Sequence, residues 1–251
     1  DLHFRTAAAI AGLTVDKVSK DQRRGAKRIT FGTMYGATEF RLAMESNISV
    51  GEAKKQLDKF WATYPKFWEW TVNLVAEGVE YGYITTPNGR RKSCPTLQGK
   101  REFLKCFITG KSPWFVLKKQ YSYAVIKQVM REIRQIRNFP VQSFTSDYIV
   151  NGTYLLTQEC EKRGIELILH TIVHDAIVGS VRFSRLREYL SIMKQIMEHD
   201  VVEQMGIICT MKIDQEVGFG YHSIHKLPWR LEDADWDNLA TVMVEGKWEE
   251  V

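Results

Sequence analysis

One set of residues at a constant spacing of four combines cationic and aromatic side chains: Arg23, Lys27, Phe31 and Tyr35. On a continuous helix this spacing places them along one slowly drifting stripe, with two cations followed by two rings. The cations suit phosphate groups and a ring suits a base or sugar, so the stripe fits a nucleoside triphosphate. The same order also fits a solvated basic turn followed by two core aromatic residues.

A second candidate is Asp175, which lies between two apolar, β-prone runs at 167–173 and 176–181. We expect it at the apex of a β-hairpin, where a fixed carboxylate is well placed to hold Mg²⁺, a cation that prefers oxygen ligands. His174 beside it is positioned to contact a backbone phosphate. A His-Asp pair also makes an ordinary polar turn, so the pair alone leaves both interpretations open.

A third polar group is the run from Asn138 to Gln142, in which two amides flank Pro140. It follows a helical pattern whose basic residues are Lys127, Arg131, Arg134 and Arg137. Asn and Gln side chains can hydrogen-bond sugar or minor-groove acceptors without selecting one base sequence. The alternative is a polar helix boundary.

Helices must position the stripe. A run of small residues that ends at Gly12 favours a first helix, and Asp16 or Ser19 can cap a proline-free helix over about 20–35. A longer helical pattern, 52–81, contains Pro65, which should bend it or break it in two.

The strands cluster later in the sequence. Pro87-Asn88-Gly89 between short β-prone stretches predicts a tight hairpin over 83–93. We then expect a basic loop or insertion at about 94–119 and two helices, at about 120–137 and 143–163, divided by Pro140. Two strands within 165–181, a helix at about 184–205 and a strand at about 208–217 should follow. Early helices and late hairpins predict an α+β fold with an antiparallel sheet.

Composition and charge restrict the classes of protein. The chain is 44% hydrophobic and 12% aromatic, enough to build a core. Residues 84–137 carry 13 basic side chains against two acids, whereas residues 231–251 carry seven acids against one lysine. We expect a polyanion partner for the basic region and a separate role for the acidic tail.

The sequence shows no signal for a cysteine metal site, a membrane span or secretion. The four cysteines have no metal-binding spacing, and no apolar stretch is long enough to span a bilayer. Without a signal peptide at the first residues, we expect a reducing, cytoplasmic setting and no membrane partner. Asp1 is not an initiator methionine, and the chain reads as part of a larger unit.

Taken together, the motifs resemble those of family A (DNA polymerase I-like) DNA polymerases. The run from Arg23 to Gly36 is similar to motif B, the fingers helix of that family, and 173–175 is similar to motif C. Three further matches lie at 1–7, 89–91 and 138–142, all in the order of the family and over roughly residues 1–220. Five short motifs in one order make coincidence a poor explanation.

The resemblance implies roles for individual side chains. Arg23 and Lys27 would bind the β- and γ-phosphates of a dNTP, with Lys27 also protonating the pyrophosphate. Phe31 would pack on the incoming sugar, where the family associates Phe with discrimination against dideoxynucleotides. Tyr35 would lie by the nascent base pair, and Gly36, which would belong to the DNA-binding residues, would let the backbone approach closely. The implied contacts to primer–template DNA are Arg134, Asn138, Gln142 and His174.

The resemblance also implies a reaction and a cofactor. In this family two Mg²⁺ ions, held by two palm aspartates, assist attack of the primer 3′-OH on the dNTP. Asp175 matches one aspartate, and the other would precede Asp1. We therefore expect a second polypeptide or an upstream segment to carry that aspartate and the thumb. Ala176 stands where motif C usually has Glu.

The implied fold is a right-hand polymerase fragment with helical fingers and an antiparallel-sheet palm. In this fold, residues 1–12 form the entry from palm to fingers, residues 13–82 the fingers and residues 83–227 the palm. Residues 228–251 form an acidic tail that contains tryptophans. The palm would include the basic insertion at about 94–119. That insertion and the tail resemble phage-type enzymes, which act in the cytoplasm of a bacterial host.

Two alternatives remain open. A single-subunit phage-type RNA polymerase shares the Arg-x-x-x-Lys, Tyr-Gly and His-Asp patterns, but Phe31 and the 138–142 run favour a DNA polymerase. The second alternative is a non-catalytic DNA-binding part or subunit of a split polymerase, in which one aspartate is missing.

Overall fold

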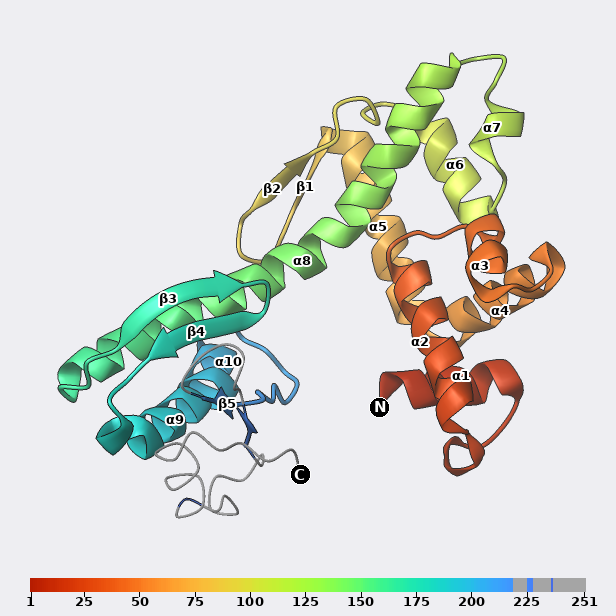
Figure 1. The fold of residues 1–251 in the computed structure, drawn as a ribbon. Coiled ribbons are helices and arrows are strands. Elements are labelled where there is room, and N and C mark those ends of the chain that lie inside the picture. Colours follow the sequence, from red (N-terminus) through yellow and green to blue (C-terminus); the bar gives the residue numbers. More distant parts are fainter. Residues whose placement is uncertain (219–224, 228–235, 237–251) are drawn as a thin grey trace. The chain divides into compact units, whose positions relative to one another are not determined.

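The computed structural model describes residues 1–218, 225–227 and 236, and the chain forms two compact units, Asp1–Phe144 and Thr145–Val251 (Figure 1). Most of the predicted acidic tail, 228–251, therefore lies outside the described residues. Its Trp236 packs against the hydrophobic core of the second unit, with its ring centre 5.4 Å from the guanidinium carbon of Arg187.

The first unit begins with four helices: α1 (Leu2–Ala11), α2 (Lys20–Met34), α3 (Glu39–Ser46) and α4 (Val50–Thr63). The sequence predicted helices at the positions of α1, α2 and α4, but it did not predict α3. Between α1 and α2 lies a short 3₁₀ helix, Val15–Lys17. α1 packs against both α2 and α4, and α3 packs on α4. The buried residues at these contacts include Ala7, Ala8, Ala26, Ala43 and Ala53, whose small side chains let the helices approach closely.

Pro65 breaks the long helical pattern, as predicted. α4 ends at Thr63 and α5 (Pro65–Tyr81) begins with the proline in its first turn. A proline is tolerated there because the first turn of a helix has no partner for its backbone N–H. The predicted hairpin follows: β1 (Tyr83–Thr85) pairs antiparallel with β2 (Arg91–Ser93).

The prediction of a long loop at 94–119 is wrong. This segment contains α6 (Arg101–Thr109) and a short α7 (Pro113–Val116). Phe103 and Cys106 face one side of α6 and are buried in the core beneath it. The glycine and proline that suggested a loop instead bound the helices, because Gly110 ends α6 with a φ of 66° and Pro113 begins α7.

The prediction of two helices divided by Pro140 is also wrong. α8 runs without interruption from Tyr123 to Lys162, with Pro140 inside it, and the boundary between the two units falls within this helix. The part before the proline packs into the first core through Ile126, Val129, Ile133 and Ile136. The part after it packs into the second core through residues such as Tyr148 and Leu156. Packing on both sides overrides the tendency of proline to end a helix.

The second unit contains the predicted late hairpin. β3 (Ile168–Val173) pairs antiparallel with β4 (Ala176–Ser180), and three helical segments follow: α9 (Leu186–Gln195), a π-helical turn (Ile196–Asp200) and α10 (Val201–Gln204). A 3₁₀ turn, Phe183–Arg185, joins the hairpin to α9.

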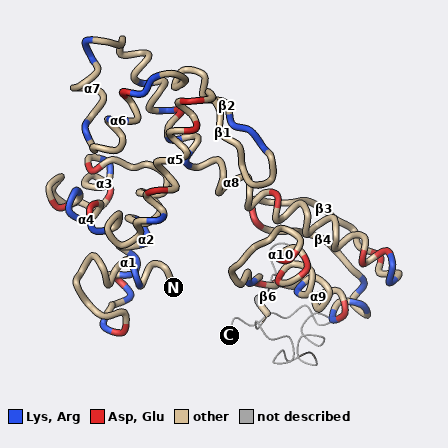
Figure 2. The backbone as a smooth tube through the Cα atoms, turned by 180° about the vertical axis from the view of Figure 1, so that it is seen from behind, with Lys and Arg blue, Asp and Glu red and all other residues tan. Residues whose placement is uncertain are grey.

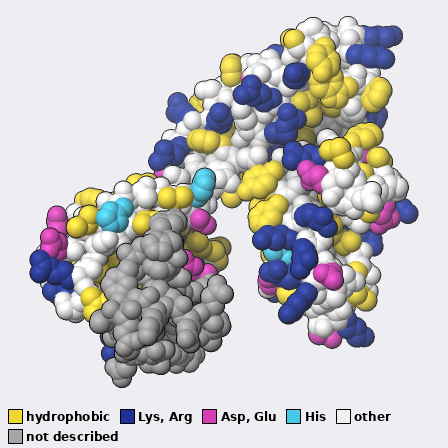
Figure 3. Space-filling view, viewed as in Figure 1, with side chains coloured by type: hydrophobic (Ala, Val, Ile, Leu, Met, Phe, Trp, Pro, Cys, Tyr) yellow, Lys and Arg dark blue, Asp and Glu magenta, His cyan; other side chains and the backbone are white. Residues whose placement is uncertain are grey.

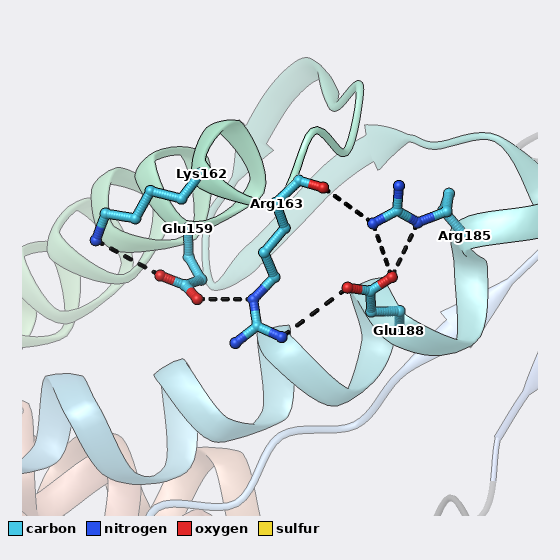
Figure 4. Close-up of polar contacts among 5 residues, drawn as sticks. All are labelled: Glu159, Lys162, Arg163, Arg185 and Glu188. Atoms are coloured by element: carbon cyan, nitrogen blue, oxygen red, sulfur yellow. Dashed lines mark hydrogen bonds and ion pairs between the residues drawn. The ribbon is translucent and has the colours of Figure 1, made fainter.

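An ion-pair network connects the end of α8 to the start of α9 (Figure 4). Arg163, directly after the end of α8, pairs with Glu159 of α8 at 2.7 Å and with Glu188 of α9 at 3.9 Å. Arg185 pairs with Glu188 at 2.8 Å and donates to the backbone carbonyl of Arg163 at 3.1 Å. Exposed pairs of this kind stabilise weakly when isolated, so their value lies in the network and its backbone bond.

The strand predicted at 208–217 is mostly absent. Only β5 (Glu216–Val217) forms there, paired with β6 (His225–Lys226). The alternating apolar residues Met211 and Ile213 instead pack against the second core without a strand partner. Although α8 has 40 residues, no helix in the described part of the chain is both long and apolar enough to cross a membrane. The predicted α+β architecture is confirmed.

Candidate functional site

The start of α2 is fixed by its own sequence. Ser19 and Gln22 form a capping box, in which the Ser19 hydroxyl accepts from the Gln22 backbone at 3.2 Å and the Gln22 side chain accepts from the Ser19 backbone at 2.9 Å. The helix then continues to Met34, and Tyr35 is its C-cap. The four stripe residues therefore follow one another along a single helix face, as their spacing predicts.

The aromatic residues of the stripe are exposed rather than part of the core. Phe31 and Tyr35 retain 39% and 42% of their accessible surface. Their rings stack with centres 6.3 Å apart and planes 11° apart, and the Lys27 ammonium lies 5.7 Å from the Phe31 ring centre. A cation beside two open rings can receive a ligand that carries both a phosphate and a flat base or sugar.

A groove of about 400 Å³ lies between α2 and α3, and it is lined by three of the four stripe residues, Lys27, Phe31 and Tyr35, but not by Arg23. Arg24, Arg28 and Arg41 add positive charge to its lining, and Arg41 is itself paired with Glu45 at 2.6 Å. Sequence analysis missed these three arginines. The signal for two of them was present, since Arg24 and Arg28 repeat the spacing of four one residue after Arg23 and Lys27.

Arg23 differs from the other stripe residues because it has a carboxylate partner. Its guanidinium donates two hydrogen bonds to one oxygen of Asp1, at 2.6 and 3.1 Å. The other Asp1 oxygen caps α1 by accepting from the His3 backbone at 2.7 Å. A triphosphate that binds Arg23 must therefore compete with Asp1 for it. Burial lowers the pKa of nearby His3, and the charges of Arg23 and Lys27 lower it further.

Gln142 of α8 contacts the stripe directly. Its side-chain amide donates to the Tyr35 hydroxyl at 3.0 Å. Arg134, Asn138 and Gln142 have a spacing of four, and the uninterrupted helix places them on one face. Arg134 and Gln142 are exposed there, and Asn138 is half-buried.

Gly36 fits this junction for two reasons. Its φ of 78° belongs to the left-handed region, which glycine adopts without strain. A Cβ at this position would also lie 2.9 Å from a guanidinium nitrogen of Arg137 and 3.1 Å from Cγ of Arg134. The backbone at Gly36 therefore lies close to two arginines of α8.

Arg137 is one of the basic residues of the 84–137 region, for which the sequence led us to expect a polyanion partner. It is 8% exposed, and it donates to the Thr33 carbonyl near the end of α2 at 3.0 Å. Its guanidinium carbon lies 5.4 Å from the Phe107 ring centre and 5.9 Å from that of Trp61. Burial lowers the pKa of Arg137 to about 10. A basic pattern along the sequence could not separate this buried arginine from Arg134.

His174 and Asp175 form the two-residue turn of the β3–β4 hairpin, because Val173 pairs with Ala176. His174 has a φ of 55°, the left-handed conformation that such tight turns require. Both residues are exposed and belong to the second unit. In the described part of the chain, no three His, Cys, Asp or Glu residues group closely enough to hold a metal. Asp175 thus supplies one hard oxygen ligand and needs others.

Comparison with known proteins gives a consistent result. The family model for DNA polymerase family A matches residues 1–223. Over 200 residues the chain is 28% identical to the thermostable DNA polymerase I of Thermus filiformis, covering 79% of this chain and 21% of that protein. Over 201 residues it is 26% identical to DNA polymerase I of Deinococcus radiodurans, covering 80% and 18%. The chain spans about a fifth of the length of these curated relatives.

A solved structure shares the fold. The POL domain of Pol1 from M. smegmatis, in complex with DNA primer–template and dNTP, superposes with a TM-score of 0.64 at 22% identity. The match covers 79% of this chain and 31% of that one.

Proposed function

Because the chain belongs to DNA polymerase family A, we propose that it forms part of a template-directed DNA polymerase and contributes the dNTP site. The observation that carries this proposal is the exposed face of α2, where Lys27, Phe31 and Tyr35 line one basic groove. We assign the fingers to 13–82 and the palm to 83–227, entered through 1–12. The DNA polymerase I relatives make the RNA polymerase alternative the weaker one.

In this proposal the side chains of α2 bind and orient the dNTP. Arg23, released from Asp1, and Lys27 bind the β- and γ-phosphates, and Lys27 donates a proton to the pyrophosphate as it leaves. Phe31 packs on the sugar. Tyr35, oriented by its hydrogen bond from Gln142, lies against the nascent base pair.

The DNA contacts come from the exposed face of α8 and from the β3–β4 turn. Arg134 binds phosphate, while Asn138 and Gln142 bind minor-groove acceptors of the primer–template without reading its sequence. His174 contacts the primer end. Gly36 allows α8 to approach the end of α2 and so keeps Gln142 within reach of Tyr35.

Asp175 is the metal ligand in this proposal. Mg²⁺ stabilises negative charge on phosphoryl oxygens, and two such ions require more than one carboxylate. Asp175 meets that need only together with an aspartate that a second polypeptide or an upstream segment provides. The exposed β3–β4 hairpin supports this idea, because Ile168, Leu169 and Ile172 present apolar side chains that a further element can cover. Ala176, at the position where the family usually has Glu, supplies no carboxylate for Mg²⁺ binding.

The setting proposed for this activity is the cytoplasm, and for a phage-encoded enzyme the cytoplasm of the bacterial host. A specific observation favours one alternative function. In the described part of the chain, Asp175 belongs to no group of three or more His, Cys, Asp or Glu residues that could hold a metal ion, which fits a non-catalytic, DNA-binding subunit of a split polymerase.

Primer extension tests the proposal and separates these functions. The 251-residue chain is assayed with a primed template, Mg²⁺ and dNTPs, first alone and then with the polypeptides that co-purify with it. We expect extension only in the second case. Robust extension by the chain alone would mean that Asp1 or Asp147 replaces the external aspartate. Tight binding of primer–template without extension under any condition would support the non-catalytic alternative.

A further inference from the structure

The segment that joins α6 to α8 presents aromatic and basic side chains to solvent. We call this area the aromatic-basic surface, and it consists of Lys111, Phe115, Val116, Lys118, Lys119 and Tyr123. Phe115 and Tyr123 retain 76% and 70% of their accessible surface, which is unusual for large rings on an ordinary protein surface. In Figure 3, hydrophobic side chains gather among Lys and Arg over the end of the first unit that carries α6 and α7.

The exposed rings are held by a packed scaffold beneath them. Pro113 and Leu117, on either side of Phe115, are buried. Trp114 packs against the first core, and its ring centre lies 4.9 Å from that of Tyr123. Because Pro113 and Leu117 are buried on either side of Phe115 and Trp114 contacts Tyr123, both exposed rings are attached to packed residues.

The surface carries positive charge. Residues 103–131 contain six Lys and Arg and no Asp or Glu, and Figure 2 shows Lys and Arg on either side of α7. Glu102, just before this stretch, already accepts a hydrogen bond from the Tyr121 hydroxyl. Within the described residues, Lys111, Lys118 and Lys119 form no ion pair with a carboxylate. Unpaired cations around open rings favour a polyanion that also offers flat faces.

We propose that the aromatic-basic surface binds single-stranded DNA. The proposal rests on the proposed polymerase function, which supplies a substrate with unpaired nucleotides. Bases stack on exposed aromatic rings only where they are not paired, whereas a duplex offers the lysines its phosphates alone. The rings therefore distinguish a single strand from a duplex, and the lysines provide affinity for both.

Binding of fluorescent oligo(dT) and of a blunt hairpin duplex to the 251-residue chain tests this proposal by fluorescence anisotropy. The first variant is Phe115→Ala/Tyr123→Ala, and its matched control is Tyr154→Ala/Phe183→Ala, which removes exposed rings of the same types from the second unit. The second variant is Lys118→Ala/Lys119→Ala, with Lys54→Ala/Lys55→Ala of α4 as control. Circular dichroism confirms that each variant folds.

We expect the ring variant to bind oligo(dT) about fivefold or more weakly per ring removed and to bind the duplex as the parent does. The lysine variant should lose affinity for both ligands, and the controls for neither. Unchanged oligo(dT) binding by the ring variant would overturn the proposal. If the ring variant lost affinity for the duplex and for oligo(dT) in equal measure, the proposal would also be overturned, and the surface would be assigned to phosphate contacts alone.

Two further outcomes are informative. If neither variant changes DNA binding but both stop the retention of an acidic protein that co-purifies with the chain, the surface is a protein-docking site and the proposal is wrong. Failure of the polymerase function is recognised separately. In that case primer extension is absent, yet the ring-dependent binding of oligo(dT) measured without dNTP or Mg²⁺ persists.

Discussion

Lys27 and Phe31 both line the groove, with the Lys27 ammonium 5.7 Å from the centre of the Phe31 ring. A phosphate contact strengthens as charge moves to the leaving group, so Lys27→Ala should both raise KM for dNTP and lower kcat in the reconstituted enzyme. Loss of a charge-assisted contact should reduce kcat/KM by about 10- to 100-fold. Lys66→Ala, at an exposed position of α5, is the control. Unchanged nucleotide kinetics would mean that the stripe has no part in binding.

Phe31 is exposed enough to accept a hydroxyl group on its ring without a clash. Phe31→Tyr should raise the incorporation of dideoxynucleotides and leave dNTP incorporation largely unchanged, because the added hydroxyl offers a polar contact beside the sugar. Competition between a dNTP and its dideoxy analogue in primer extension measures the ratio. Phe40→Tyr in α3, at a more exposed position outside the groove lining, should leave the ratio unaltered.

Asp175 and Asp147 carry the same side chain in opposite environments. Asp175 is exposed in a hairpin turn, whereas Asp147 is buried on α8. Asp175→Asn should preserve primer–template binding while turnover falls by about a hundredfold or more. Asp147→Asn should instead lower the melting temperature, since it alters a buried polar group. An Asp175→Asn enzyme with more than about a tenth of parental turnover would remove this residue from the metal site.

At the scale of elements, α8 links the two units and also fixes the end of α2. Arg137 of α8 fixes the end of α2 through its hydrogen bond to Thr33, and its guanidinium also contacts the rings of Trp61 and Phe107. A cation at the C-terminal end of a helix also interacts favourably with the helix dipole. We regard Arg137 as a positioning residue for the nucleotide-binding helix.

Arg137→Met tests this role, because methionine keeps much of the packing volume and loses the hydrogen bond to α2. We expect KM for dNTP to rise several-fold with kcat nearly constant, and the melting temperature to fall only slightly, since the buried charge is removed as well. Steady-state kinetics and thermal unfolding measure the two effects. A large loss of stability with unchanged KM would make Arg137 a purely structural residue.

At the scale of the molecule, the β3–β4 hairpin exposes apolar residues along a strand that has one partner in the described part of the chain. Exposed apolar strand edges promote association. The isolated chain should therefore self-associate, and Ile168→Lys on β3 should reduce this in sedimentation velocity experiments. Ile208→Lys, at an exposed position outside the hairpin, is the control. Equal effects of both substitutions would show that net charge, rather than the hairpin, governs association.

Local signals in the sequence determined much of this protein. The capping box at Ser19, the spacing of the α2 stripe, Pro65 at a helix start and the hairpin turns at 87–89 and 174–175 all depend on residues within a few positions of one another. Such features are set by backbone geometry and nearby side chains, so these elements and the family could be predicted.

Tertiary packing decided the rest. Pro140 lies within a continuous helix because α8 is packed into a hydrophobic core on each side of it. The segment that was expected to be a loop forms α6 because the helix buries Phe103 and Cys106 in the first core. The partners of Arg23, Tyr35 and Arg137 lie 22, 107 and 104 residues away along the chain. No local pattern encodes such contacts, because they depend on which helix faces meet once the apolar residues are buried.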